Sequence, residues 1–170
     1  MSYIYLIECE TESSEIVTKI GVSTAPERRI IQWLDLIQIS YLKFQNITYN
    51  DIYTNPSNQH IEKYNISDIK QHIVKQVDEN FKIFQLDSCG SAEYLERHLH
   101  EYLLTNKKRP ILYFGNIKEC PISISKEFYQ LKIDEVVRVM KNKNRLLPVK
   151  FKKNTECYTK YLSRKAKREL

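Results

Sequence analysis

The sequence has widely spaced cysteines, no long apolar run and no internal repeat, and these absences exclude several classes of protein. Cys9, Cys89, Cys120 and Cys157 lie far apart and lack the Cys-x-x-Cys spacing of zinc sites, so they predict reduced thiols in an intracellular protein. No apolar stretch reaches the roughly 20 residues that a membrane-spanning helix needs. The N-terminal apolar stretch is too short for a signal peptide and lacks a basic start. We therefore expect a cytoplasmic protein without a membrane partner.

Basic residues are concentrated at the C-terminus. Residues 141–170 contain eleven Lys and Arg side chains against two acidic ones, whereas residues 1–140 have a net charge of −3. Such a segment is typical of proteins that bind a polyanion, most often nucleic acid, although it could also be only a solvated tail. Tyr158 and Tyr161 lie among these cations and favour nucleic acid, because aromatic rings can stack on bases. The predicted organisation is a main domain over 1–140 and a basic C-terminal extension over 141–170.

Apolar periodicity predicts an α/β protein. Residues 3–8 and 16–22 are rich in β-branched and aromatic side chains and predict an antiparallel hairpin, in which Tyr5 would pair with Lys19. A core strand is predicted over 81–86, and residues 41–49 could form another. Apolar residues at helical spacing, together with cap residues, predict the helices. These helices are expected at 25–38, 66–80, 92–104, 134–144 and 155–166.

Four side chains of these elements suit phosphodiester chemistry. They are Tyr5 in Tyr3-Ile4-Tyr5, Lys19 in Lys19-Ile20-Gly21, Arg29 near the start of the first helix, and Glu96 on the helix at 92–104. Cleaving a phosphodiester requires a deprotonated nucleophile, stabilisation of charge on the phosphoryl oxygens and a stabilised leaving group. A single carboxylate with waters is enough to hold Mg²⁺ for the last two tasks.

The residues and their order resemble the GIY-YIG nuclease superfamily. The Lys-Ile-Gly form of the second motif is similar to the branch found in phage and large-virus DNA-binding proteins. The resemblance implies that Tyr5 helps to activate water, that Lys19 replaces the tyrosine of the second motif, and that Arg29 binds phosphate. It also implies that Glu96 binds Mg²⁺ or Mn²⁺, and that Gly21 allows close packing.

The resemblance also implies a fold and identifies departures from the family pattern. The implied fold is a small, three-stranded, mostly antiparallel sheet flanked by helices, which makes residues 40–80 an insertion with a helical segment. Tyr3 stands where the family usually has glycine. Trp33 stands where many members have a histidine or tyrosine that can transfer a proton, which an indole cannot do. The late asparagine of the family has no secure counterpart.

Helix geometry supports Glu96 independently of the resemblance. At 100° per residue, Glu96 falls on the flank of the apolar stripe of its helix, and His100 lies one turn further along the same flank. A carboxylate at the edge of a core is partly desolvated, as functional carboxylates often are. The spacing of Glu96, Leu99 and His100, and the later segment Glu127-Phe128-Tyr129, also match the viral branch.

Each candidate has an ordinary structural interpretation as well. Tyr5 could be a core residue, and Arg29 could form an ion pair with Glu27 or Asp35. Lys19 could be an exposed strand residue, or it could keep a lowered pKa beside Tyr5 and transfer a proton. Glu96 could bridge to a neighbouring cation such as Arg97.

The sequence therefore predicts a Mg²⁺- or Mn²⁺-dependent DNA endonuclease with Tyr5, Lys19, Arg29 and Glu96 as catalytic residues. RNA stays open as a substrate, and a homodimer is possible, because one such site usually cuts both strands only as two copies or in two binding events. The residues predicted to bind nucleic acid are Arg28, His100, Lys150, Lys152, Lys153, Arg164 and Lys165. Two alternatives stay open: a non-catalytic DNA-binding module on the same fold, and a viral protein–protein interaction or structural protein.

Overall fold

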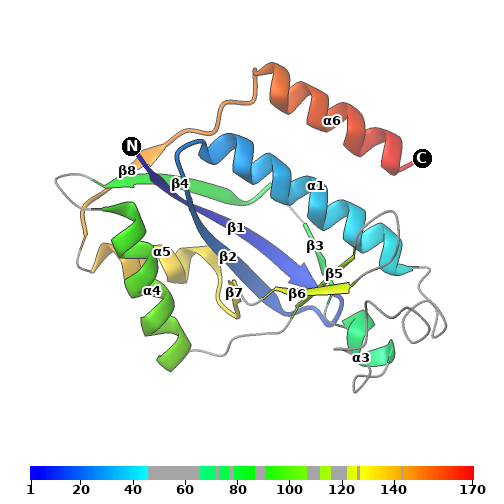
Figure 1. The fold of residues 1–170 in the computed structure, drawn as a ribbon, viewed down its shortest axis with the longest axis horizontal. Coiled ribbons are helices and arrows are strands. Elements are labelled where there is room, and N and C mark those ends of the chain that lie inside the picture. Colours follow the sequence, from blue (N-terminus) through cyan, green and yellow to red (C-terminus); the bar gives the residue numbers. More distant parts are fainter. Residues whose placement is uncertain are drawn as a thin grey trace.

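One antiparallel sheet organises the chain in the computed structural model (Figure 1). The structure describes residues 1–45, 66–71, 73–76, 79–86, 91–106, 112–115, 122–125, 127–142 and 144–170. The hairpin of β1 (Tyr3–Thr11) and β2 (Ile16–Ser23) lies at the centre of the sheet. The full order is β7 (Phe128–Tyr129), β2, β1, β4 (Phe81–Leu86) and β8 (Leu146–Val149), and β3 (Val74–Lys75) also pairs with β1. A separate pair is formed by β5 (Leu112–Gly115) and β6 (Ile122–Ser125).

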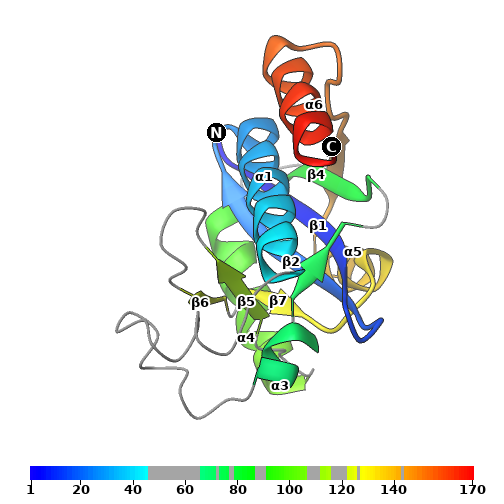
Figure 2. The ribbon, with the colours of Figure 1, turned by 90° about the vertical axis from the view of Figure 1, so that its right-hand side faces the viewer.

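Helices cover both faces of the sheet (Figures 1 and 2). On one face, α1 (Pro26–Gln45) packs on β1 and β2, and α6 (Glu156–Arg168) adds Tyr158 and Tyr161 to the same core. On the other face lie α4 (Ala92–Asn106) and α5 (Ile133–Lys141). The described residues also include the short helix α3 (Ile66–Gln71). Alternate residues of a strand point to opposite faces, so β1 contributes side chains to the cores on both faces of the sheet. This is why its sequence is an almost continuous apolar run.

The α/β class is confirmed, but the sheet is larger than expected. It has six strands, whereas the resemblance implied three. The additional strands β3, β7 and β8 span only two to four residues each, which is too short for a period of two to be recognised. Tertiary pairing with β1, β2 and β4 therefore determines that these segments are strands.

Two predictions for the segment 40–80 are wrong where the structure describes it. Helix α1 continues to Gln45 instead of giving way to a strand at 41, because Ile37, Ser40 and Phe44 extend its buried face at helical spacing. The helix expected over 66–80 ends at Gln71, and Val74–Lys75 pairs with β1. Residues 46–65 of the predicted insertion lie outside the described residues.

The basic C-terminal segment is packed onto the rest of the chain. β8 pairs with β4, and α6 is held to α1 by Asp35, whose carboxylate accepts from Arg164 and Arg168 at 2.7 Å each. Tyr158 and Tyr161 are buried, so the expectation that these two rings stack on bases is wrong. Their three-residue spacing places both rings on the apolar face of an amphipathic helix. Among the helices in the described residues, none combines the length and the apolar character that crossing a bilayer requires.

Candidate active site

The β1–β2 register brings Tyr5 over Gly21. Tyr5 pairs with Gly21, and Ile7 pairs with Lys19, so the predicted Tyr5–Lys19 pairing is wrong by two residues. A shift by two keeps every side chain on the same face, and Tyr5 and Lys19 therefore still lie together beneath α1. A Cβ atom at Gly21 would lie 2.3 Å from both Cζ and the hydroxyl oxygen of Tyr5. Only glycine leaves space for the phenol at this position.

Lys19 is a buried cation with several partners. Its side chain is 4 % exposed, which excludes the interpretation as a surface strand residue. The ammonium donates to the Glu127 carboxylate and, at 3.1 Å, to the Ile20 carbonyl. It also lies 4.8 Å from the centre of the Trp33 ring and 5.9 Å from that of Tyr5. Burial lowers the pKa of Lys19, and the Glu127 carboxylate opposes this effect.

Tyr5 is buried and remains a neutral phenol at neutral pH. Burial raises the pKa of its hydroxyl, because the desolvated phenolate would be costly. Hydrogen bonding with the Arg29 and Trp33 side chains acts in the opposite direction and favours the phenolate. The Arg29 guanidinium therefore favours a developing negative charge on the hydroxyl, although burial keeps the pKa raised.

Arg29 is on the first turn of α1 and reaches the same patch from the solvent side. Its guanidinium donates to Gln32 at 3.0 Å and lies 5.9 Å from the centre of the Trp33 ring. The two acidic residues that could have paired with it have other partners: Glu27 accepts from the Lys152 backbone, and Asp35 accepts from α6. Arg29 is exposed, so its guanidinium is accessible to an anion.

Glu96 lies on α4 at the edge of this patch. Its side chain is half-buried, and within the described residues its carboxylate forms no hydrogen bond or ion pair, including the one considered with Arg97. Burial raises the pKa of Glu96, the Lys19 ammonium lowers it, and the Glu127 carboxylate raises it. These mutual effects place Glu96 within electrostatic reach of the Lys19–Glu127 pair.

Glu127 is the residue of the site that sequence reasoning did not select. It directly precedes β7, whose pairing with β2 sets Phe128 opposite Lys19. Burial acts to raise the pKa of Glu127, but the Lys19 ammonium outweighs it, and the pKa is lowered. His100, which was predicted to bind nucleic acid, is half-buried, and its Nδ1 lies 2.6 Å from the Tyr129 hydroxyl. The feature of the sequence that could have identified Glu127 was the Glu127-Phe128-Tyr129 segment.

Among the described residues, Glu96 is the carboxylate of this patch that could bind a divalent cation. They contain no group of three or more His, Cys, Asp or Glu side chains that could hold a metal ion. A hard cation such as Mg²⁺ needs only one or two protein carboxylates when waters and phosphate oxygens fill its other positions. The Glu96 carboxylate fits this requirement, because it is half-buried and forms no ion pair within the described residues.

A comparison with protein families identifies the domain. The model of the T5orf172 domain matches residues 2–143, which include the β1–β2 hairpin, α1, α4 and Glu127. The chain belongs to the T5orf172 domain family. This domain is found in phage proteins and is associated with nuclease-type folds, which is consistent with a nuclease or DNA-binding role. No curated protein and no solved structure matches the chain.

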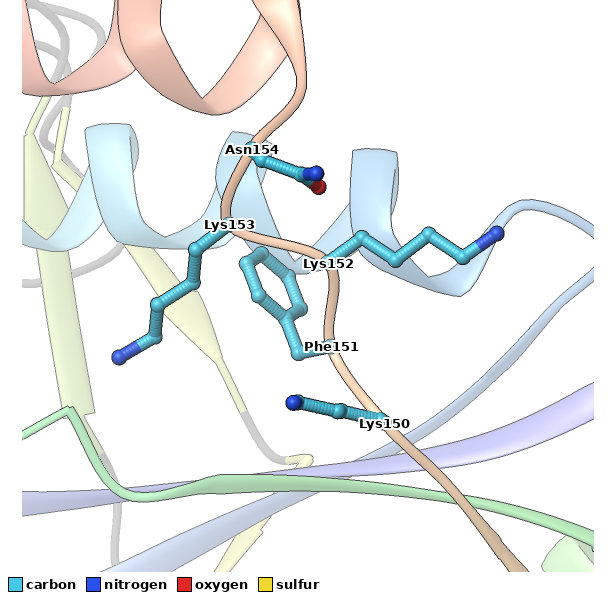
Figure 3. A pocket seen from close by; sticks show the side chains of 5 residues that line it. All are labelled: Lys150, Phe151, Lys152, Lys153 and Asn154. Carbon is cyan, nitrogen blue, oxygen red and sulfur yellow. The ribbon is translucent and has the colours of Figure 1, made fainter.

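A lysine-rich segment beyond the matched T5orf172 region lies against α1. Residues 150–154 line an open cavity of about 780 Å³, and their three lysine side chains extend in different directions (Figure 3). The backbone N–H of Lys152 donates to Glu27 on the first turn of α1 at 2.8 Å. Lys153 pairs with Glu79 at 2.7 Å, whereas the exposed Lys150 and Lys152 side chains form no ion pair among the described residues.

Proposed function

We propose that this T5orf172 domain is a divalent-metal-dependent endonuclease that hydrolyses phosphodiester bonds in DNA. The proposal is carried by one observation: Lys19 and Arg29 both lie over the Trp33 indole, Lys19 also lies over the Tyr5 ring, and the Glu96 carboxylate lies within electrostatic reach of Lys19. Residues that lie far apart in the sequence thus form a patch that joins a phenol, two cations and a carboxylate. An ordinary packed core rarely gathers desolvated ionisable groups of this kind.

Each residue has a role that follows from its surroundings. The exposed Arg29 guanidinium binds the non-bridging oxygens of the scissile phosphate, because its planar donors match a phosphate. The Tyr5 hydroxyl orients the attacking water, and Lys19 accepts the proton of that water when its side chain is a neutral amine. Burial brings the pKa of Lys19 down toward the range that suits proton transfer. Glu96 would hold Mg²⁺ or Mn²⁺, which stabilises charge on the phosphoryl and leaving oxygens when bound.

The basic surface beside α1 would supply affinity for DNA. Lys150, Lys152 and Arg28 are exposed cations that form no ion pair among the described residues, and we assign them contacts to phosphates that flank the cleaved one. Lys153 and Arg164 already pair with Glu79 and Asp35, so they contribute less to DNA binding than the sequence suggested. His100 and Lys165, which are half-buried, are also expected to be secondary contacts.

A non-catalytic DNA-binding module is the second candidate. It is favoured by Trp33, which cannot transfer a proton, and by the Glu127 carboxylate, which neutralises the Lys19 ammonium. This candidate predicts DNA binding without cleavage in any divalent metal.

A plasmid-nicking assay separates the two candidates. Wild type, Glu96→Gln and the control Glu101→Gln, an exposed carboxylate on the same helix, are compared with Mg²⁺, with Mn²⁺ and with EDTA. We expect nicking by the wild type and the control, and none by Glu96→Gln or with EDTA. Nicking that survives in Glu96→Gln would refute the proposed site. Binding without nicking by the wild type would establish the module instead.

A further inference from the structure

Trp33 lies at the centre of the candidate site. It is the only tryptophan of the chain, and its side chain is almost completely buried. The Lys19 ammonium and the Arg29 guanidinium lie 4.8 and 5.9 Å from the centre of its ring. The Phe128 ring packs against it in a T-shaped arrangement, at a centroid distance of 5.9 Å and an interplanar angle of 79°. Two cations that approach Tyr5 therefore share one aromatic platform.

The contacts of Lys19 explain why an aromatic platform is useful there. An ammonium group has three N–H donors, and two of them go to the Ile20 carbonyl and the Glu127 carboxylate. The negative face of an indole is the strongest π partner for a cation among the amino acids. Because Lys19 and Trp33 are both almost completely buried, little water competes for this contact.

Arg29 requires the platform for a different reason. A long side chain on the exposed first turn of a helix has many rotamers, and ordering it costs conformational entropy. Guanidinium planes stack on aromatic faces, and such stacking restricts those rotamers before an anion arrives. The hydrogen bond from Arg29 to Gln32 at 3.0 Å adds to this restriction.

We propose that Trp33 is a positioning residue, whose indole holds the Lys19 ammonium and the Arg29 guanidinium in place beside the Tyr5 phenol. Trp33 occupies the position where the resemblance led us to expect a group that transfers a proton. Its contribution would be geometric, through the two cations, and not through a proton of its own. The inference rests on the proposed nuclease function for its kinetic effects, but the placement of the cations can be tested without cleavage.

The kinetic test compares two substitutions of Trp33 that differ in their π face. Trp33→Phe retains an aromatic face, whereas Trp33→Leu retains apolar bulk alone; Phe44→Leu, a buried aromatic further along α1, is the matched control for core damage. We expect Trp33→Leu to lower kcat for plasmid nicking by about tenfold to thirtyfold, the range that a desolvated cation–π contact supports. Trp33→Phe should retain most of kcat, and Phe44→Leu should leave kcat within about threefold of wild type, as expected for a change that only removes core packing.

Equal kcat values for Trp33→Phe and Trp33→Leu, each measured at a temperature where the variant is folded, would overturn the proposal. Thermal unfolding of every variant identifies that temperature. A structural role alone would make kcat follow thermal stability in all three variants, whereas a positioning role makes Trp33→Leu fall below Phe44→Leu at equal stability.

A double-mutant cycle tests the platform independently of nuclease activity. Lys19→Met, Trp33→Leu and the double variant are compared by urea unfolding at pH 7. If the indole holds the ammonium, the two changes are not additive, and the coupling should correspond to a factor of about five to thirty in the unfolding equilibrium constant. Additive effects would overturn the platform. A wild type that never nicks DNA but shows the coupling would instead refute the nuclease function and retain the positioning role of Trp33.

Discussion

Replacing Glu127 with glutamine tests the ion pair that orients Lys19. The substitution retains the shape of the side chain but removes the carboxylate that, among the described residues, is hydrogen-bonded to the almost completely buried Lys19 ammonium. Losing one partner of a fully buried ion pair typically costs about 3–5 kcal/mol. The Glu127 side chain is 55 % exposed, so solvent screening reduces this cost, and we expect a loss of about 1–2 kcal/mol of unfolding free energy at pH 7.

The pH dependence of this loss has a defined sign. Within the folded protein, the Lys19 ammonium holds the pKa of Glu127 below its ordinary value of 4.5, although burial acts in the opposite direction. The stabilisation is therefore fully present above pH 4.5 and is lost as the pH falls through the lowered pKa of the folded state. Because a glutamine resembles a protonated glutamate, Glu127→Gln and wild type should become equally stable at low pH.

Urea unfolding of both proteins between pH 7 and pH 3 measures the difference. We expect a gap of about 1–2 kcal/mol at pH 7 that closes toward pH 3. In a Lys19→Met background the gap should largely disappear at every pH, because the cation is absent. A gap that is constant from pH 7 to pH 3, or that persists in Lys19→Met, would refute the assignment of the stabilisation to the ion pair.

Three further predictions follow from the contacts of the site and of the C-terminal segment. Gly21→Ala places a methyl group 2.3 Å from the Tyr5 hydroxyl. We expect thermal unfolding to show a loss of about 1–3 kcal/mol of unfolding free energy, and the nicking assay to show a loss of cleavage. Unchanged stability and cleavage would contradict the close packing. Lys150→Gln with Lys152→Gln should reduce the slope of log affinity against log salt by about 1.8, measured by fluorescence anisotropy of labelled duplex DNA. The control pair Lys153→Gln with Lys160→Gln changes the net charge equally but removes cations that pair with Glu79 and Glu156. An equal reduction of the salt slope by both pairs of substitutions would disprove selective phosphate contacts by Lys150 and Lys152. Asp35→Asn removes the carboxylate that accepts from both Arg164 and Arg168. We expect urea unfolding to show a loss of about 1–2 kcal/mol of unfolding free energy, and no loss in a chain that ends before α6. A loss retained in that shortened chain would point to another cause.

Much of the local structure could be predicted from the sequence. The strands at Tyr3–Thr11, Ile16–Ser23 and Phe81–Leu86 follow from β-branched and aromatic runs, and their approximate positions are confirmed. The helix that begins at Ala92 has the expected cap, because the Tyr94 N–H donates to the Ser91 hydroxyl at 3.3 Å. These features depend on neighbours within a few residues, and that information is contained in the order of the residues.

The contacts between distant segments could not be predicted in this way. A period of two determines which face Tyr5 occupies but leaves the register free to shift by two. The observed register places the phenol over Gly21, where a larger residue would clash. Glu127 reaches Lys19 from a position 108 residues further along the chain, through a strand of two residues. Composition pointed Tyr158 and Tyr161 toward nucleic acid, whereas packing of α6 on α1 buries both rings.

The sequence by itself determined the residue types of the candidate site, their order and the elements that carry them. The tertiary structure decided that Lys19 is buried, that Glu127 pairs with it, and that Trp33 joins Lys19 to Arg29. The physical reason is that burial and charge pairing depend on groups brought together only by long-range packing. The same lysine would be an ordinary solvated cation on an isolated hairpin, and the fold makes it a desolvated one with a single carboxylate and an aromatic face.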